Sequence, residues 1–423
     1  MKKRKKLVFA LFIVMFSVIF SYLPNVYASD YTTNSKNSIN TYIKIILYFL
    51  PIIFLICSII IWYIYGRDDK VDDTIEFYPP EGFNSLEVGF LYKGRADMLD
   101  LVSLLIYLGN KGYIKIASTI KETMTHSFRN IVKITQIKDY DGNNTIEKEL
   151  LESLMRCGRV DAENVVTSDN LYNRYHFYAR DILDIMINCK ENKESIFEKV
   201  KWQKFAIIIM IIISYFAITI VPIVETIGSN SISLGLIFST ILFTFFIIRL
   251  FDFTRETTIY GNNIGGSISD ILTIFLFGLA SIPQLFFVPK FKSNVFYLCI
   301  YIIGMICIIG MTLCFFYLRR RTPYGKQMLK KTSGLRNFIL TADKAKLESL
   351  VAQNPNYFYD ILPYAYAFGL SSKWIDNFEN IPITAPCWYG SLKKFSFDTF
   401  RSFFHSSMSL LKYNMIYEDR DWD

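Results

Sequence analysis

The sequence is poor in histidine and has no paired cysteine motif, and both absences bear on metal sites. Its three histidines, His126, His176 and His405, lie far apart, and no HxxxH or HExxH spacing puts two of them on one helical face. None of the seven cysteines forms a CxxC pair. We therefore expect no metal site, no cofactor and no disulfide framework.

Motifs that mark catalytic loops are missing as well. There is no GxSxG turn for a serine nucleophile. The glycine-rich stretch 261–266 lacks the Lys-Ser/Thr pair that completes a phosphate-binding loop. Glu147, Glu149 and Glu152 share one predicted helix, and we interpret them as its solvated face rather than as a catalytic pair. The sequence therefore indicates no catalytic and no cofactor-binding residue, and we expect a protein that is not an enzyme.

Charged side chains are scarce between residues 205 and 318, where only four Lys/Arg and four Asp/Glu occur. A bilayer core demands helices of roughly 17–25 apolar residues. The block holds four such runs, at 205–224, 232–251, 271–288 and 295–318. Its charges lie at or near the ends of the runs, so an ion pathway through the centre is not supported. Gly235, Gly278, Gly304 and Gly310 are expected to permit close helix packing.

The N-terminal part of the chain predicts the orientation of the whole. Residues 1–28 have a basic start, an apolar run and a small-residue cleavage site, which indicates a signal peptide; an uncleaved first membrane helix is the alternative. Residues 29–42 would then be a short extracellular segment. The next transmembrane helix, 43–65, contains Pro51 and ends in a charged stop.

This order predicts a multi-pass cell-membrane protein with five spans, its N-terminus outside after signal cleavage and its C-terminus in the cytoplasm. Residues 66–204 and the tail 319–423 would be two cytoplasmic domains. The formal net charge of +8 is largely membrane-flanking, with clusters at residues 2–6 and 319–321. Such clusters are typical of cytoplasmic loops, and no nucleic acid is expected as a partner.

Residues 66–204 have the pattern of a compact α+β domain. A capping box at residues 84–87 begins a short helix, and a second helix follows from Asp97 to a stop at Gly112. Strands are predicted at 113–117 and 131–137, then a helix after Asn144 and a last helix at 168–189. This order suggests a winged-helix-like domain.

The tail is predicted to be mainly helical. Helices are expected at 344–351, in the aromatic-rich stretch 357–370 and at 373–379, with an extended segment at 381–389. Residues 395–411 place aromatic and aliphatic side chains at helical spacing. Two alternatives remain open for this helix: it lies on the bilayer, or it packs on the core of the tail.

Several short motifs resemble YciQ-like predicted bacterial membrane proteins, a domain of unknown function. The motifs, spread over residues 76–389, are PPEGF at 79–83, EVG at 87–89, KGYIKI at 111–116, GLRNFI at 334–339, LPYAYAFGL at 362–370 and KW at 373–374. The resemblance implies an extracellular β-rich domain, a membrane span, a cytoplasmic region and further spans, and it implies no activity. This sequence lacks the extracellular β-rich domain and the glycine-rich end that many members carry.

The pattern as a whole predicts a polytopic α-helical membrane protein with a cytoplasmic, winged-helix-like α+β domain and a helical cytoplasmic tail. The leading hypothesis is an interaction or scaffold protein, with the lipid bilayer and unknown cytoplasmic proteins as partners. The first alternative is a transporter or accessory subunit for a lipid or cell-wall substrate. The second is a membrane-tethered regulator. The sequence does not decide whether the tail packs on residues 66–204.

Overall fold

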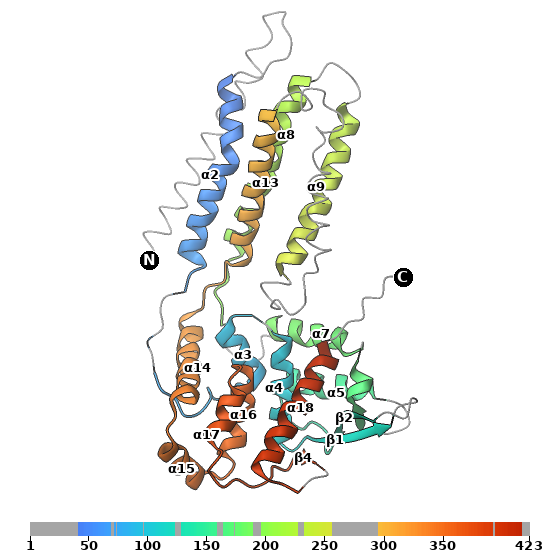
Figure 1. The fold of residues 1–423 in the computed structure, drawn as a ribbon. Coiled ribbons are helices and arrows are strands. Elements are labelled where there is room, and N and C mark those ends of the chain that lie inside the picture. Colours follow the sequence, from blue (N-terminus) through green and yellow to red (C-terminus); the bar gives the residue numbers. More distant parts are fainter. Residues whose placement is uncertain are drawn as a thin grey trace, which may run out of the picture. The chain divides into compact units, whose positions relative to one another are not determined.

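The computed structural model describes ten stretches of the chain and the single residue Asp72 (Figure 1). The stretches are 41–68, 74–95, 97–122, 128–158, 164–172, 174–188, 196–226, 232–255, 295–391 and 394–416. The predicted signal peptide at 1–28 and the predicted span at 271–288 lie outside the described residues. The described chain divides into two compact units, which are treated separately below.

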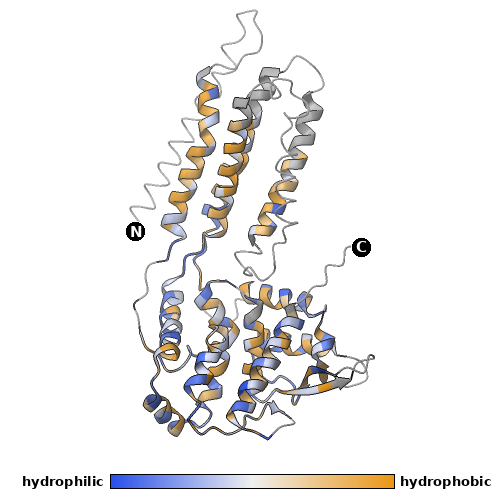
Figure 2. Ribbon diagram, viewed as in Figure 1, coloured by the Kyte–Doolittle hydropathy of each residue, from blue (hydrophilic) through white to orange (hydrophobic). Residues whose placement is uncertain are grey.

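In the described residues, the first unit contains four long helices. They are α2 (Thr41–Tyr65), α8 (Lys201–Thr226), α9 (Ile232–Arg255) and α13 (Val295–Phe316). Three of the described helices contain stretches long and apolar enough to cross a membrane, namely Tyr42–Tyr65, Lys201–Thr219 and Cys299–Phe316. Figure 2 shows apolar residues along most of their length. At 1.5 Å per residue, each is about as long as a hydrocarbon core is thick.

Helix α13 packs against both α2 and α8, and two glycines bring the helices close. A Cβ on Gly304 would lie 2.8 Å from Ile218 on α8, and a Cβ on Gly310 would lie 2.8 Å from Leu55 on α2. The expectation that these glycines permit close packing is confirmed for both positions. Gly235 and Gly278 are at positions whose surroundings the structure does not describe.

Most of the buried serine and threonine hydroxyls in the described part of this unit are satisfied within single helices, whereas Ser58 on α2 donates to Sδ of Met210 on α8 at 3.7 Å. Ser214 donates to the Met210 carbonyl oxygen at 2.7 Å, and Thr312 donates to the Ile308 carbonyl oxygen at 2.9 Å. Such bonds to the preceding turn let a hydroxyl enter an apolar interior without a partner on another helix. In the described part of the bundle, the interior is therefore an apolar core in which the buried serine and threonine hydroxyls have acceptors.

The second unit is an α+β structure built from two stretches of chain that flank most of the membrane helices. The earlier stretch contributes α3 (Ser85–Lys93), α4 (Met98–Asn110), β1 (Ile114–Glu122), β2 (Phe128–Gln136), α5 (Thr145–Cys157), β3 (Val165–Thr167), α6 (Ser168–Leu171) and α7 (Tyr175–Asn188). The later stretch contributes α14 (Pro323–Thr341), α15 (Lys344–Gln353), α16 (Tyr357–Ala367), α17 (Ser371–Asn377), β4 (Tyr389–Gly390) and α18 (Phe397–Ile416).

Many of these elements begin or end at local signals that are visible in the sequence. The predicted strands form the antiparallel hairpin β1–β2, which is longer than expected and pairs Ile114 with Gln136 and Glu122 with Phe128. Gly112 adopts the left-handed conformation with φ of 79°, which stops α4 before the first strand. The Asn144 side chain accepts from the backbone N–H groups at the start of α5.

The sheet has the strand order β3–β2–β1–β4, and its two outer strands were not predicted. Strand β3 pairs antiparallel with β2. Strand β4 comes from the tail and pairs parallel with β1, opposite Ile116 and Ala117. A winged-helix-like description covers the hairpin and its neighbouring helices, but it leaves out a sheet that joins two distant stretches of chain.

The two predicted cytoplasmic domains, 66–204 and 319–423, are not separate in the structure, because they share one hydrophobic core. Helix α16 packs on α3 and α4, and α18 packs on α6, α7 and β2. Phe400, Phe404 and Leu411 of α18 are fully buried in this core. Of the two alternatives for the amphipathic helix, the structure therefore shows core packing. The predicted last helix at 168–189 is divided into α6 and α7.

Candidate functional site

The corner between α3 and α4 carries a buried group of charges. Helix α3 starts with a capping box in which the Asn84 side chain accepts from the Glu87 N–H and the Glu87 carboxylate accepts from the Asn84 N–H. It ends at Gly94, whose φ of 70° turns the chain sharply. The first turn of α4 contains Asp100. This corner places Lys93, at the end of one helix, beside the start of the next.

Lys93 contacts two buried carboxylates. Its Nζ lies 2.6 Å from Oδ1 of Asp100 and 3.3 Å from Oδ2 of Asp97. The two aspartates are 1% and 4% exposed. Oδ2 of Asp100 has no hydrogen-bond partner among the described residues. It packs against Gly89, where a Cβ would lie only 2.5 Å away, so the glycine provides the space that the carboxylate fills.

Burial is the largest influence on the acidity of this site. Loss of solvation raises the pKa of Asp100 to about 7, although the nearby positive charge of Lys93 lowers it and Asp97 raises it further. Tyr366 on α16 also interacts with Asp100, and burial raises the pKa of this tyrosine to about 12. Asp100 is therefore a carboxyl group inside the fold that takes up or releases a proton near neutral pH.

A third buried carboxylate, Glu147, connects α5 with the start of α3. It is 8% exposed, and its two oxygens accept from Nδ2 of Asn84 and from the Tyr140 hydroxyl, both at 3.0 Å. Burial raises the pKa of Glu147, while the two hydrogen bonds lower it. Because both oxygens are satisfied by protein donors, this network stabilises the packing of the two helices.

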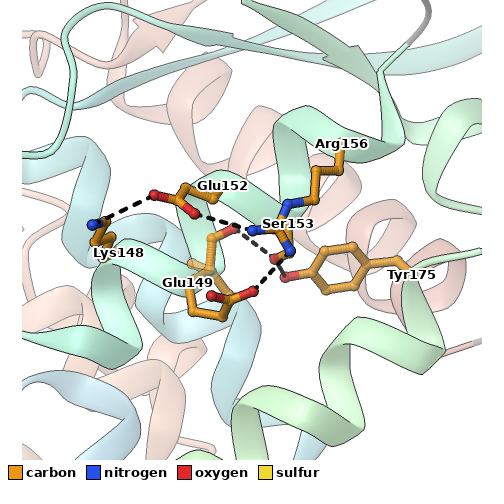
Figure 3. Close-up of polar contacts among 7 residues, drawn as sticks. Lys148, Glu149, Glu152, Ser153, Arg156 and Tyr175 are labelled. Atoms are coloured by element: carbon orange, nitrogen blue, oxygen red, sulfur yellow. Dashed lines mark hydrogen bonds and ion pairs between the residues drawn. The ribbon is translucent and has the colours of Figure 1, made fainter.

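Glu147 differs from its neighbours on the same helix. Figure 3 shows Glu149 and Glu152 meeting Arg156, each at 3.1 Å, while Ser153 lies next to the Tyr175 hydroxyl. The prediction of a solvated face holds for the ion-paired Glu149 and Glu152 and is wrong for Glu147. Two residues turn a helix by about 200°, so Glu149 points away from the side that Glu147 buries.

The aromatic motif at 362–370 joins the two stretches of the second unit. The Tyr364 hydroxyl donates to the Phe83 carbonyl oxygen at 3.1 Å, within the buried interface. Just before the motif, the Tyr357 hydroxyl donates to the Phe77 carbonyl oxygen at 2.6 Å. The motifs that carry the family resemblance thus meet in space, and the contacts they make are those of a folded core.

The histidines and cysteines considered in the sequence do not form a shared site in the part of the chain that the structure describes. His176 is buried on α7, and His405 is exposed on α18. His126 and the glycine-rich stretch 261–266 lie outside the described residues. Within the described ranges, no group of three or more His, Cys, Asp or Glu side chains is arranged to hold a metal ion.

The cluster of Lys93, Asp97 and Asp100 was not predicted from the sequence, because charged residues of these types are common at helix ends. Asp97 and Asp100 stand where acidic residues usually mark a helix start, and Lys93 stands where a basic residue marks a helix end. The signal that could have identified the cluster is the pairing of Gly89 on α3 with Asp100 on α4, the next helix. This pairing becomes visible only in the tertiary structure, where the glycine leaves space for the carboxylate.

Comparison with known proteins identifies a family for most of the chain. A family model described as the C-terminal domain of predicted membrane proteins, DUF2207, covers residues 74–378. No curated protein matches the chain. No solved structure matches it either. The match supports a predicted membrane protein family and leaves the narrower YciQ-like resemblance a prediction.

Proposed function

Because the chain belongs to the DUF2207 family of predicted membrane proteins, whose C-terminal domain it matches over residues 74–378, we propose that it is a membrane-anchored interaction protein without chemistry of its own. The observation that carries this proposal is the shared core of the second unit. In the described residues the chain passes between the two units three times, near residues 68, 197 and 320. A unit held by three connections suits the display of a docking surface at a membrane.

The orientation of the membrane unit follows from the charges at its two ends. The chain leads into the second unit from the end that carries Arg67, Lys201, Lys204, Arg319 and Arg320. At the opposite end, Lys44 is the one cation in the described first turns. Cytoplasmic ends of membrane helices carry the excess of Lys and Arg. These charges support our proposal that the second unit and the C-terminus are cytoplasmic.

The edge of strand β1 is the surface best suited to a protein partner. Ile116 donates its backbone N–H to the Trp388 carbonyl oxygen, so the backbone groups of Ser118 and Ile120 face the same edge. Strand β4 ends at Gly390, opposite Ala117, and no described strand continues along that edge. Ile120 is 62% exposed. An extended segment of a partner can add to such an edge as a further strand.

A photo-crosslinking residue in place of Ser118, in the full-length protein in native membranes, tests this docking edge. We expect one cross-linked protein, identified by mass spectrometry. Ile120→Pro should abolish the adduct, because it removes an N–H that points out of the hairpin. The matched variant Ile120→Thr keeps that N–H and should preserve the adduct. Equal cross-linking in both variants, or none in the parent, would reject the docking edge.

The described residues give less support to the two alternative functions, a transporter and a membrane-tethered regulator. A transporter requires a polar path, whereas the buried hydroxyls of the described bundle find acceptors inside an apolar core, Ser214 and Thr312 within their own helices and Ser58 on the sulfur of Met210. A membrane-tethered regulator that binds DNA requires a strongly basic face. On the hairpin, Arg129 is already paired with Asp169 at 2.6 Å.

A further inference from the structure

The basic end of the membrane unit brings three separate parts of the chain together. A Cβ on Gly66, after α2, would lie 3.0 Å from the carbonyl oxygen of Tyr317, after α13. Nη1 of Arg320 donates to the Ile64 carbonyl oxygen at 3.3 Å. The N–H of Glu198, before α8, donates to the Arg320 carbonyl oxygen at 2.8 Å. The end of α2, the start of α8 and the end of α13 therefore form one surface.

Positive charge exceeds negative charge on this surface. Residues 62–68, 198–205 and 315–320 contain six cations and two carboxylates. The cations are Arg67, Lys199, Lys201, Lys204, Arg319 and Arg320, and the carboxylates are Asp68 and Glu198. Lys204 and Arg319 lie close enough to interact as like charges, and Lys204 also lies 4.9 Å above the Phe315 ring. An anion bound here would relieve that repulsion.

Exposed aromatic side chains surround the same surface. Trp202 is 81% exposed, Tyr63 is 59% exposed and Tyr317 is 57% exposed. Tryptophan and tyrosine favour the boundary between headgroups and acyl chains, because the ring is apolar and its polar atom reaches water. These rings therefore mark the level at which the cations meet lipid headgroups.

An apolar stripe leads away from the cations along α8. Phe205, Ile212 and Phe216 are 46–54% exposed and recur at helical spacing on the face that begins with Trp202. Lys201 and Lys204 flank the start of this stripe. A ligand with an anionic head and long apolar chains would satisfy both parts at once, whereas a small soluble anion would use only the cations.

We propose that Lys201, Lys204 and Arg319, beside the exposed Trp202, form a binding site for the phosphate headgroup of an anionic phospholipid, with its acyl chains along Phe205, Ile212 and Phe216. Basic clusters directly next to a membrane helix attract anionic lipid, and each cation adds to the attraction. The site lies within the membrane unit alone and does not depend on the proposed docking function.

The test measures lipid binding to the purified full-length protein in a neutral detergent by native mass spectrometry. Short-chain phosphatidylglycerol, phosphatidylcholine with the same acyl chains, and inorganic phosphate are the three probes. We expect phosphatidylglycerol to bind at least about tenfold more tightly than phosphatidylcholine. The triple variant Lys201→Gln, Lys204→Gln, Arg319→Gln should weaken phosphatidylglycerol binding by about tenfold to a hundredfold.

The matched control removes the same charge from the second unit, by Lys115→Gln, Lys133→Gln and Lys331→Gln, and should bind as the parent does. Equal binding of the two lipids, or an unaffected triple variant, would overturn the proposal. Displacement of the lipid by an equal concentration of inorganic phosphate would assign the site to a soluble anion instead. If the triple variant does not fold, the salt dependence of phosphatidylglycerol binding to the parent protein tests the site instead. An affinity that stays unchanged between about 50 mM and 500 mM salt would reject an electrostatic site.

Discussion

At the scale of single residues, Asp100 is the least ordinary position in the described chain. It is a fully buried carboxyl group with one oxygen on Lys93 and the other against Gly89. A carboxylate held in this way keeps its charge only at a cost in solvation. Protonation of Asp100 is therefore coupled to folding, so the free energy of unfolding depends on the pH of the solution.

The predicted consequence is a stability that decreases as the pH rises. The unfolded carboxyl group loses its proton near its ordinary pKa of 3.8 and the folded one near about 7, so between these values the folded protein binds the extra proton. The free energy of unfolding should decrease through that window by up to about 1.4 kcal/mol per pH unit from this group, and stay level above it.

The measurement is the thermal unfolding midpoint of the full-length protein in detergent at a series of pH values from about 5 to 8. Asp100→Asn should show a clearly flatter profile than the parent. Lys93 lies 3.3 Å from Asp97 in the parent, so it has a second carboxylate to pair with in the variant. Asp376→Asn, at an exposed aspartate that pairs with Arg401, is the control and should keep the parent profile. Parallel profiles for Asp100→Asn and the parent would show that Asp100 is not the titrating group.

At the scale of elements, the packing of α13 depends on the absence of side chains. Gly304 contacts Ile218 on α8, and Gly310 contacts Leu55 on α2. Without a hydrophobic driving force between helices in lipid, close backbone approach is a main source of their association. Ile218 is β-branched and has little freedom to move its Cγ2 away.

Gly304→Ala should therefore weaken the helix bundle by roughly 1–3 kcal/mol, because the new methyl group would meet Ile218 at 2.8 Å. Ile306→Ala on the same helix is the matched control. Ile306 is 60% exposed, so its truncation should change stability by less than about 0.5 kcal/mol. Unfolding in mixed detergent micelles would measure both. A Gly304→Ala variant as stable as the parent would mean that the helices separate there at no cost.

At the scale of the whole molecule, the second unit depends on two distant stretches of chain. Trp374, Phe400 and Phe404 of the later stretch share a core with Leu105 and Ile116 of the earlier one. Strand β4 completes the edge of a sheet whose other strands lie more than 200 residues earlier. Neither stretch has a complete core of its own.

Residues 74–204 expressed alone should therefore lack a cooperative unfolding transition and be cleaved rapidly by protease. The same residues joined by a flexible linker to 321–416 should fold and resist cleavage. The chain truncated after Ile416, with every other residue kept, is the control for loss of the C-terminal end, and it should behave as the parent. A folded, protease-resistant 74–204 fragment would contradict the shared core, and the same experiment decides which fragment is fit for binding assays.

The sequence by itself determined the elements whose causes are local. Long apolar runs specified the helices α2, α8, α9 and α13, because a bilayer sets both the length and the composition of the helices that cross it. Of these, α2, α8 and α13 contain stretches long and apolar enough to cross a membrane. Capping and turn residues such as Asn84, Gly112 and Asn144 specified where helices begin and end. More than half of the residues that carried the family resemblance are buried, among them Phe83, Ile116 and Tyr364, and these residues specify an architecture rather than an activity.

Only the tertiary structure decided which of these elements share a core. Strands β3 and β4 have three and two residues, too few for a periodic signal, and the parallel partner of β1 lies in the tail. The burial of Glu147 and Asp100 was hidden for the same reason. A carboxylate on a helix has the same local pattern whether it faces water or a neighbouring element, and only packing between segments far apart in the chain removes the water from it.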